Sequence, residues 1–171
     1  AHIGDTAEQF RSSFPESWIH TFEPCDESFM FMEKRFGKMG RTYLNNIAIG
    51  DSSKDDVSMY VTHNEGSSSL LKPKESANKF WKGNPLNIEK KIKVRVHTID
   101  EYCEEKNVSK IDILKIDVQG NEIKVLEGAK RMLKKNRINL IFTEISIAPN
   151  YEGQSEIDEI IRLLRTYGYR I

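Results

Sequence analysis

The chain has 171 residues, of which 38% are hydrophobic and 30% charged, so it can bury one sizeable core and is expected to form a single domain over residues 1–171. Its 26 lysines and arginines balance its 26 aspartates and glutamates, which argues against a nucleic-acid partner. No apolar run approaches the roughly 20 residues of a membrane span, and no signal peptide is visible.

The cysteines and the chain ends bear on location and extent. Cys25 and Cys103 stand alone without the CxxC spacing of a zinc or redox site, so we expect a reducing cytoplasm. The chain opens with a glycine turn of the kind that follows a strand, and residues 168–171 read as the start of a new strand. We therefore expect a longer protein, truncated here at both ends.

Helix and strand signals alternate over the first 49 residues. Asp5 and Glu8 have capping-box spacing, and Asp26 is placed to cap a second helix. The predicted elements are a helix from residue 5 that ends before Pro15, a strand over 18–22, a helix over 26–36 and a strand over 43–49. This order predicts an α/β fold.

Residues 57–98 interrupt that order. Residues 57–61 alternate between apolar and polar side chains, and Ile92, Val94 and Val96 alternate in the same way. Between them lies a polar, loop-rich stretch. We predict an antiparallel insertion that forms a wall or lid of the site and sets acceptor specificity.

The order returns after Thr98, which is predicted to cap a helix with Glu101. Residues 111–116 form a largely β-branched run typical of a strand in a parallel sheet. Gly120 permits a tight turn into a helix, which carries buried positions at helical spacing. A strand over 137–144 and a helix opened by Ser155 and Asp158, with a buried stripe that begins at Ile157, are predicted to follow.

Two stretches suit a nucleotide-like ligand. Gly4 lies in a turn into a helix, and Glu23 closes a strand 19 residues later, the spacing at which an acidic residue binds ribose hydroxyls. The full GxGxxG is absent, which disfavours a dinucleotide. Taken alone the signal is weak, and a surface glutamate in a turn is then the better reading of Glu23. Residues 46–51 could flank an adenine, although a simple turn at Asp51 is at least as good a reading.

Charged side chains gather where two neighbouring strands end. Lys115 and Asp117 share one strand face, and Glu144 follows the next strand. A lysine in such a strand is costly unless a carboxylate answers it, so a structural ion-pair network is the alternative to a catalytic role. Asp117 is the better functional candidate. The four histidines lack metal spacing, so no metal site is predicted, but His63 or His97 could reach a substrate.

Together these residues resemble the FkbM family of S-adenosylmethionine-dependent methyltransferases. Three blocks carry the resemblance: GDT with FEP at residues 4–6 and 22–24, NIAIGD at 46–51, and DILKIDVQGNEIKVLEGA at 112–129, followed by Glu144. The serine run at 67–69 is also similar to the family. The match spans nearly the whole chain, and the central block is the most specific part.

The resemblance implies a Rossmann-like methyltransferase sheet with helices on both faces, S-adenosylmethionine as cofactor, and a hydroxyl oxygen of a sugar, glycan or polyketide-like molecule as acceptor. It implies that Gly4 lies against the amino-acid part of the donor, that Glu23 binds the ribose diol, and that Ala48, Ile49 and Asp51 border the adenine. Asp5, Thr6, Pro24 and Asn46 complete the implied donor set.

A sulfonium methyl group is already activated, so positioning supplies much of the rate and a base need only take the hydroxyl proton. Asp117 is the candidate base or orienting group, Lys115 its partner, and His63 the second candidate. The alternative from another class is a non-catalytic nucleotide- or S-adenosylmethionine-binding domain of the same fold. A nicotinamide-dependent oxidoreductase is a weaker third hypothesis, because the pyrophosphate glycines are lacking.

Overall fold

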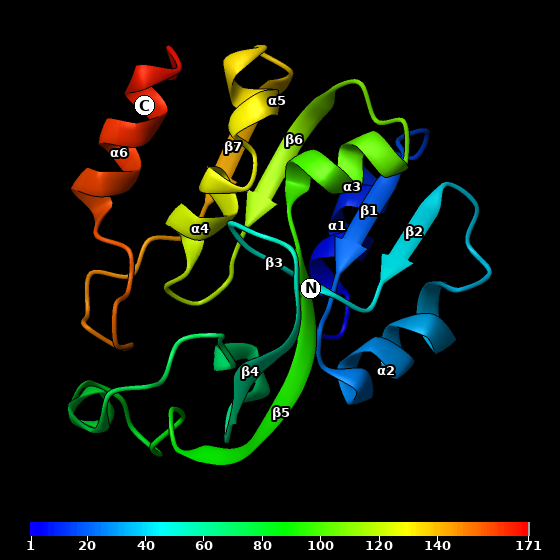
Figure 1. The fold of residues 1–171 in the computed structure, drawn as a ribbon. Coiled ribbons are helices and arrows are strands. Elements are labelled where there is room, and N and C mark those ends of the chain that lie inside the picture. The colour runs from blue at the N-terminus through cyan, green and yellow to red at the C-terminus, as the bar shows by residue number, and fades with distance from the viewer. Residues whose placement is uncertain (171) are drawn as a thin grey trace. The chain divides into compact units, whose positions relative to one another are not determined.

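The computed structural model describes residues 1–170 and falls into two compact units, one over residues 1–48 and the other from residue 49 onward. Each unit mixes helices with small sheets (Figure 1). The first unit contains α1 (Asp5–Ser13), β1 (Ile19–Phe22), α2 (Asp26–Phe36) and β2 (Thr42–Asn45). β1 and β2 pair in parallel, with Ile19 opposite Thr42.

Two arginines tie the first unit together. Arg11 of α1 donates hydrogen bonds to the carbonyl oxygens of Ser17 (2.9 Å) and Arg41 (2.9 Å), so the helix is fixed to the residues that precede β1 and β2. Arg35 of α2 pairs with Asp5 at 2.7 Å and also with Glu8. These contacts link residues far apart in sequence and hold the two helices on one small sheet.

The predicted caps of both helices in this unit are wrong. Gly4, with a φ of 91°, is the N-cap of α1, and Asp5 and Glu8 point to Arg35 instead of closing a capping box. Cys25 is the N-cap of α2, so Asp26 is its first helical residue. In both cases an acidic residue lies in the first turn, where its charge still complements the helix dipole.

The second unit begins within β3 (Ala48–Ile49), so the strand predicted over 43–49 is in fact two short strands, β2 and β3. The predicted antiparallel insertion is confirmed, because β4 and β5 pair with Val57 opposite Val94. The strand order in this sheet is β3, β5, β4. The elements of this region are β4 (Lys54–Thr62), the short 3-10 helices η1 (Glu65–Ser67) and η2 (Glu75–Phe80), and β5 (Ile88–His97).

The remaining elements of the second unit build its core. They are α3 (Ile99–Glu105), β6 (Ile111–Ile116), α4 (Glu122–Glu127), α5 (Lys130–Lys134), β7 (Ile138–Thr143) and α6 (Ile157–Thr166). β6 and β7 run in parallel side by side, as the sequence predicts (Figure 1). The predicted cap of α3 is confirmed, since the Thr98 hydroxyl accepts a hydrogen bond from the Glu101 amide at 3.1 Å.

Some side chains of the last two elements differ from prediction. Glu156 caps α6 and forms a capping box with Glu159, in place of Ser155 and Asp158. Ile157 is 42% exposed, so the buried stripe of α6 rests on Ile160 and Leu164. The stripe is therefore narrower than the sequence pattern indicates.

The helix predicted after β6 breaks in two at Gly128. A Cβ added to Gly128 would lie 2.0 Å from the carbonyl oxygen of Gly50, so the two backbones are in direct contact. The Gly128 carbonyl also accepts a hydrogen bond from the Asp100 amide at 2.9 Å, which secures the start of α3. Gly128 of the central block is thus required by packing between backbones.

We predict that Gly128→Ala destabilises the protein by on the order of 1–3 kcal/mol or more, because the methyl group cannot fit without moving backbone. Urea denaturation measures the change. Gly66→Ala is the matched control in the same unit, since its Cβ would reach only the tip of Asn64 at 3.4 Å, and should change little. Equal unfolding midpoints for Gly128→Ala and wild type would contradict this account of the break.

Candidate active site

The end of the β6–β7 sheet brings together the charged residues that the sequence singled out. Ile116 lies opposite Thr143 in the parallel register, so the residues that follow, Asp117 and Glu144, emerge at the same edge. Open α/β sheets place their ligands at this carboxyl edge. The two carboxylates therefore lie where a reaction site is expected.

Lys115 forms an ion pair with Asp117, as predicted. Its ammonium nitrogen lies 2.9 Å from Asp117 Oδ2, and the lysine side chain is largely buried while the aspartate is more open. The Gln119 side-chain amide then bridges the two acids, because its Nε2 donates to Asp117 Oδ1 at 2.8 Å and to Glu144 Oε2 at 3.0 Å. One amide group thus fixes the spacing of the carboxylates.

The paired acids have opposite pKa shifts. Burial alone would raise the pKa of Asp117, but hydrogen bonds with Glu144 and then Lys115 outweigh it and lower the pKa to about 2. The hydrogen bond with Asp117, followed by burial and the negative charge of Asp117, raises the pKa of Glu144 to about 7. The lowered pKa of Asp117 is consistent with the prediction that it is ionised at neutral pH, and the pKa of Glu144 lies near neutrality.

A strained turn carries Gln119. Gln119 has a φ of 55° and Gly120 a φ of 93°, so two consecutive residues occupy the left-handed region. The buried carboxylate of Glu122 accepts hydrogen bonds from the amides of Val118 (3.3 Å) and Gly120 (3.1 Å), and burial raises its pKa. Glu122 is thus part of the structural support for the turn, and the strain is stored next to the acids.

Two further residues hold the turn from outside the central block. The hydroxyl of Ser69, within the serine run, donates to the Gln119 carbonyl at 2.8 Å. Tyr151 is only 1% exposed; its hydroxyl donates to the Ser67 carbonyl at 2.7 Å and lies 3.2 Å from Gln119 Oε1. Residues distant in the sequence therefore orient the Gln119 amide.

Sequence reasoning missed Tyr151. It lies in an irregular loop after β7, and nothing in its local pattern distinguishes it from a surface tyrosine. The serine run was noted only as a point of family resemblance, and its contact with the turn explains why hydroxyl groups are suited to it.

The histidine candidates lie on β5 and at the end of β4. His63 is exposed, and its Nδ1 lies 2.9 Å from Glu89 Oε1. His97 Nε2 lies 3.0 Å from Glu105 Oε1, which links β5 to α3. Over residues 1–170, no group of three or more histidine, cysteine, aspartate or glutamate side chains could hold a metal ion.

In the first unit, Glu23 lies beside the Gly4 turn. Its buried carboxylate accepts hydrogen bonds from the backbone amides of His2 at 2.6 Å and Cys25 at 2.9 Å, and from the Ala1 amino group at 3.2 Å. A Cβ on Gly4 would meet the Phe36 ring at 2.3 Å, so packing alone already requires this glycine. The turn and Glu23, which the sequence assigns to the same ligand, therefore lie side by side in this unit.

The other residues that are predicted to bind the methyl donor differ in their surroundings. The Asn46 side-chain amide donates to the Glu23 carbonyl oxygen at 3.2 Å. Burial acts to raise the pKa of Asp51, but hydrogen bonds from Ser52 and from Lys124, which lies 3.1 Å away, lower it. Asp5 is exposed, Thr6 and Pro24 are half-buried, and Ala48 and Ile49 are buried.

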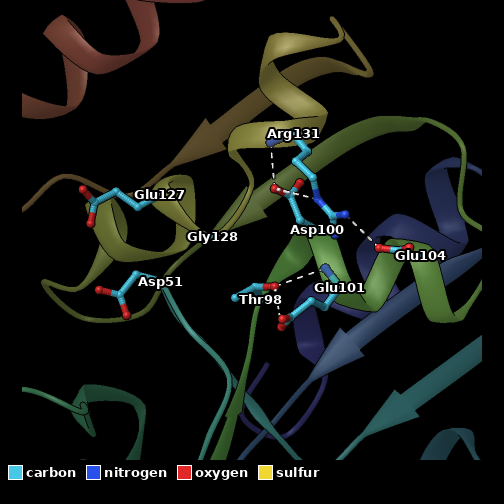
Figure 2. Close-up of a pocket in the computed structure, with 8 residues that line it drawn as sticks. All are labelled: Asp51, Thr98, Asp100, Glu101, Glu104, Glu127, Gly128 and Arg131. Carbon is cyan, nitrogen blue, oxygen red and sulfur yellow. Dashed lines mark hydrogen bonds and ion pairs between the residues drawn. The ribbon is translucent and has the colours of Figure 1, made fainter.

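A pocket of about 350 Å³ lies beside α3 and the α4–α5 break (Figure 2). Its lining is Asp51, Thr98, Asp100, Glu101, Glu104, Glu127, Gly128 and Arg131. Arg131 joins Asp100 and Glu104, and Asp100 also accepts hydrogen bonds from the amides of Arg131 (2.7 Å) and Met132 (3.0 Å). Asp100 binds the backbone amides in the first turn of α5, and Arg131 of α5 pairs with Asp100 and Glu104 of α3. The contacts of these acids are therefore structural.

Comparison with known proteins identifies the family. The model for the methyltransferase FkbM domain matches residues 1–171. The chain belongs to the FkbM methyltransferase family. It is also similar to the 2-O-methyltransferase NoeI of Sinorhizobium fredii (strain NBRC 101917 / NGR234), with 28% identity over 172 residues, covering 96% of this chain and 68% of that protein. No solved structure matches the chain.

The family assignment confirms the resemblance read from the three sequence blocks, and the mixed α/β structure is consistent with a methyltransferase-like fold. Among the helices of residues 1–170, none is long and apolar enough to cross a membrane. The FkbM central block supplies Lys115, Asp117 and the Gln119 turn, and Glu144 completes the cluster.

We predict that Glu144→Gln is more stable than wild type above neutral pH. A folded-state pKa of about 7, above the ordinary value of 4.5, means that Glu144 contributes stability below about pH 4.5 that is lost as the pH rises through 7. Glutamine keeps the uncharged shape at every pH. The free-energy difference between variant and wild type, measured by urea denaturation, should therefore grow in favour of the variant from pH 4.5 to 8.

Glu75→Gln, at an exposed acid of the same unit, is the control for the loss of one surface carboxylate. The stabilising contribution of the lowered Asp117 pKa is lost only as the pH falls toward 2, outside this window. Parallel curves for Glu144→Gln and wild type would show that Glu144 titrates normally.

Proposed function

We propose that this FkbM-family methyltransferase transfers a methyl group from S-adenosylmethionine to a hydroxyl oxygen of a sugar, glycan or polyketide-like acceptor. The observation that carries the proposal is the Asp117, Lys115 and Glu144 cluster at the carboxyl edge of β6 and β7. The similarity to a protein named as a 2-O-methyltransferase supports an oxygen acceptor. We further propose that the chain acts as one methyltransferase domain.

Glu23 is suited to bind the ribose of S-adenosylmethionine. A carboxylate offers about four lone-pair directions, and the backbone amides of His2 and Cys25 take two of those of Glu23. A ribose diol brings two hydroxyl donors, which fit the two remaining directions. The remaining candidates of the donor set are Gly4, Asp5, Thr6, Pro24, Asn46, Ala48, Ile49 and Asp51.

Asp117 is placed to bind and orient the acceptor hydroxyl. S-adenosylmethionine, when bound, supplies a methyl group already activated by its sulfonium. The protein's task is then to hold an oxygen in line with it, and the Lys115 ammonium keeps Asp117 charged and fixed for that purpose. His63 is a second candidate for the acceptor side, because it is exposed on the insertion.

The insertion is proposed to form the acceptor wall. Ser69 of this segment donates a hydrogen bond to the Gln119 carbonyl, and Ser67 accepts one from Tyr151, so the insertion is attached directly to the turn that carries the site. Its polar loops can vary without disturbing β6 and β7. Acceptor preference would then follow the sequence of this segment.

One observation favours a second function, a binding domain without catalysis. Two backbone amides, those of His2 and Cys25, already bind Glu23, which is the arrangement expected if this carboxylate only stabilises the turn before α1. This alternative predicts little or no turnover with any hydroxyl acceptor. Incubation with methyl-labelled S-adenosylmethionine and a mixture of monosaccharides and methyl glycosides, read by label transfer, separates the two functions.

We predict that Glu23→Gln binds S-adenosylmethionine more weakly by on the order of 1.5–3 kcal/mol, because it replaces charge-assisted hydrogen bonds to the ribose with neutral ones. Isothermal titration calorimetry measures the affinity, and thermal melting verifies the fold. Glu16→Gln alters an acid whose side chain is 85% exposed in the same unit and should leave binding unchanged. A folded Glu23→Gln protein of wild-type affinity would refute the role of Glu23.

A further inference from the structure

We propose that Glu144 is the group that takes the proton from the acceptor hydroxyl, and that Gln119 is the positioning residue that holds it beside Asp117. This inference rests on the proposed methyl transfer and divides the work of the site between its two acids. Asp117 orients the acceptor, and Glu144 accepts the proton. The division follows from what each carboxylate already contacts.

Each oxygen of Asp117 already accepts a hydrogen bond from the protein and keeps a second lone pair for the acceptor hydroxyl. Lys115 holds Oδ2 at 2.9 Å and Gln119 holds Oδ1 at 2.8 Å. A carboxylate fixed in this way has rigid geometry, which suits orientation, but its hydrogen bonds stabilise the charged form and make it a weak base. An effective general base instead has a pKa close to the working pH.

Glu144 has the complementary properties. It lies on the loop that begins after β7, is exposed, and has Oε2 held by the Gln119 amide at 3.0 Å. Exposure gives an accepted proton a direct route to water. The turn that carries Gln119 is itself fixed by Ser69 and Tyr151, so the position of Glu144 relative to Asp117 depends on the protein and not on the acceptor.

The charges facing Glu144 come from each neighbouring segment. Asp117 on the extension of β6 and Glu122 of α4 favour its protonated form, whereas Lys115 of β6 favours the ionised form. Tyr151, from the loop after β7, stays protonated because burial and these acids raise its pKa. The two acids prevail over the single lysine and raise the pKa of Glu144 to about 7.

The proposed step balances as follows. The acceptor oxygen forms a bond to the methyl carbon while the carbon–sulfur bond breaks, and that electron pair stays on sulfur. The acceptor O–H bond breaks, and its proton passes to the Glu144 carboxylate. Glu144 then releases the proton to water, which restores the starting state.

Methylation kinetics across pH test this assignment with the label-transfer assay described above. Wild-type kcat/KM should rise with pH to a plateau, with a midpoint near the Glu144 pKa of about 7. In Glu144→Gln this rise of kcat/KM with pH, the pH limb, should be absent. Its turnover should fall roughly 10²–10⁴-fold, while its affinity for S-adenosylmethionine is unchanged. Asp117→Asn should retain a pH limb, moved to lower pH, because the charge that raises the Glu144 pKa is gone.

A second readout does not depend on turnover. Carboxyl-carbon NMR of Glu144 should titrate near pH 7 in wild type and at lower pH in Asp117→Asn, which removes the neighbouring charge. Gln119→Leu should also move the midpoint, because it removes the amide that binds Glu144 and fixes its spacing from Asp117. A midpoint that Gln119→Leu leaves in place would overturn the positioning role of Gln119.

The outcomes separate the two proposals. If wild type transfers methyl groups and Glu144→Gln keeps both its rate and its pH limb, the inference about Glu144 is wrong while the proposed function stands. The same conclusion follows if Asp117→Asn, and not Glu144→Gln, abolishes the limb. If wild type binds the donor but transfers no methyl group, the proposed function fails and the role of Glu144 fails with it.

Discussion

A partly buried lysine near the end of a strand is costly unless a carboxylate pairs with it, and the arrangement of the site depends on how this chain pairs Lys115. Lys115 reaches the carboxylate two residues further on, so Asp117 is fixed where β6 ends. Once Asp117 is fixed, an acid on the neighbouring strand end cannot ionise independently. The Gln119 bridge keeps the two acids at hydrogen-bonding distance and makes their titrations interdependent.

The site thus obtains two different groups from the same chemical type. Hydrogen bonds with Glu144 and then with Lys115 lower the pKa of Asp117, and the hydrogen bond with Asp117 raises the pKa of Glu144 to about 7. Paired acids with separated pKa values are a recurring way to divide roles in enzymes. This arrangement lowers the stability of the folded protein whenever Glu144 ionises, because a second negative charge then lies beside Asp117.

Local sequence signals were enough for much of the second unit. The Lys115 and Asp117 pair, the Thr98 cap and the β4–β5 pairing all depend on residues within a few positions of one another or on alternation along a strand. The predictions that are wrong concern side chains whose contacts are determined by a residue distant in the sequence. Asp5 looked like part of a cap but pairs with Arg35, 30 positions away, which no local spacing can indicate.

Long-range contacts also explain the other errors. The helix after β6 had unbroken apolar spacing, yet Gly128 meets the backbone of Gly50 and the helix divides there. Glu144 was visible as a charge at a strand end, but its relation to Asp117 depends on Gln119, and the orientation of Gln119 depends on a tyrosine in a loop. Tertiary geometry, not residue type, gives these side chains their roles.

The buried hydroxyl of Tyr151 links three stretches separated by dozens of residues: the serine run, the turn after β6 and the loop after β7. Contacts of such long sequence separation form only after most of the chain has been ordered, since loop closure must come first. We therefore expect the site to be completed late in folding. A partially folded chain could already contain β6 and β7 and still lack the fixed geometry between their acids, so structure and competence need not be acquired together.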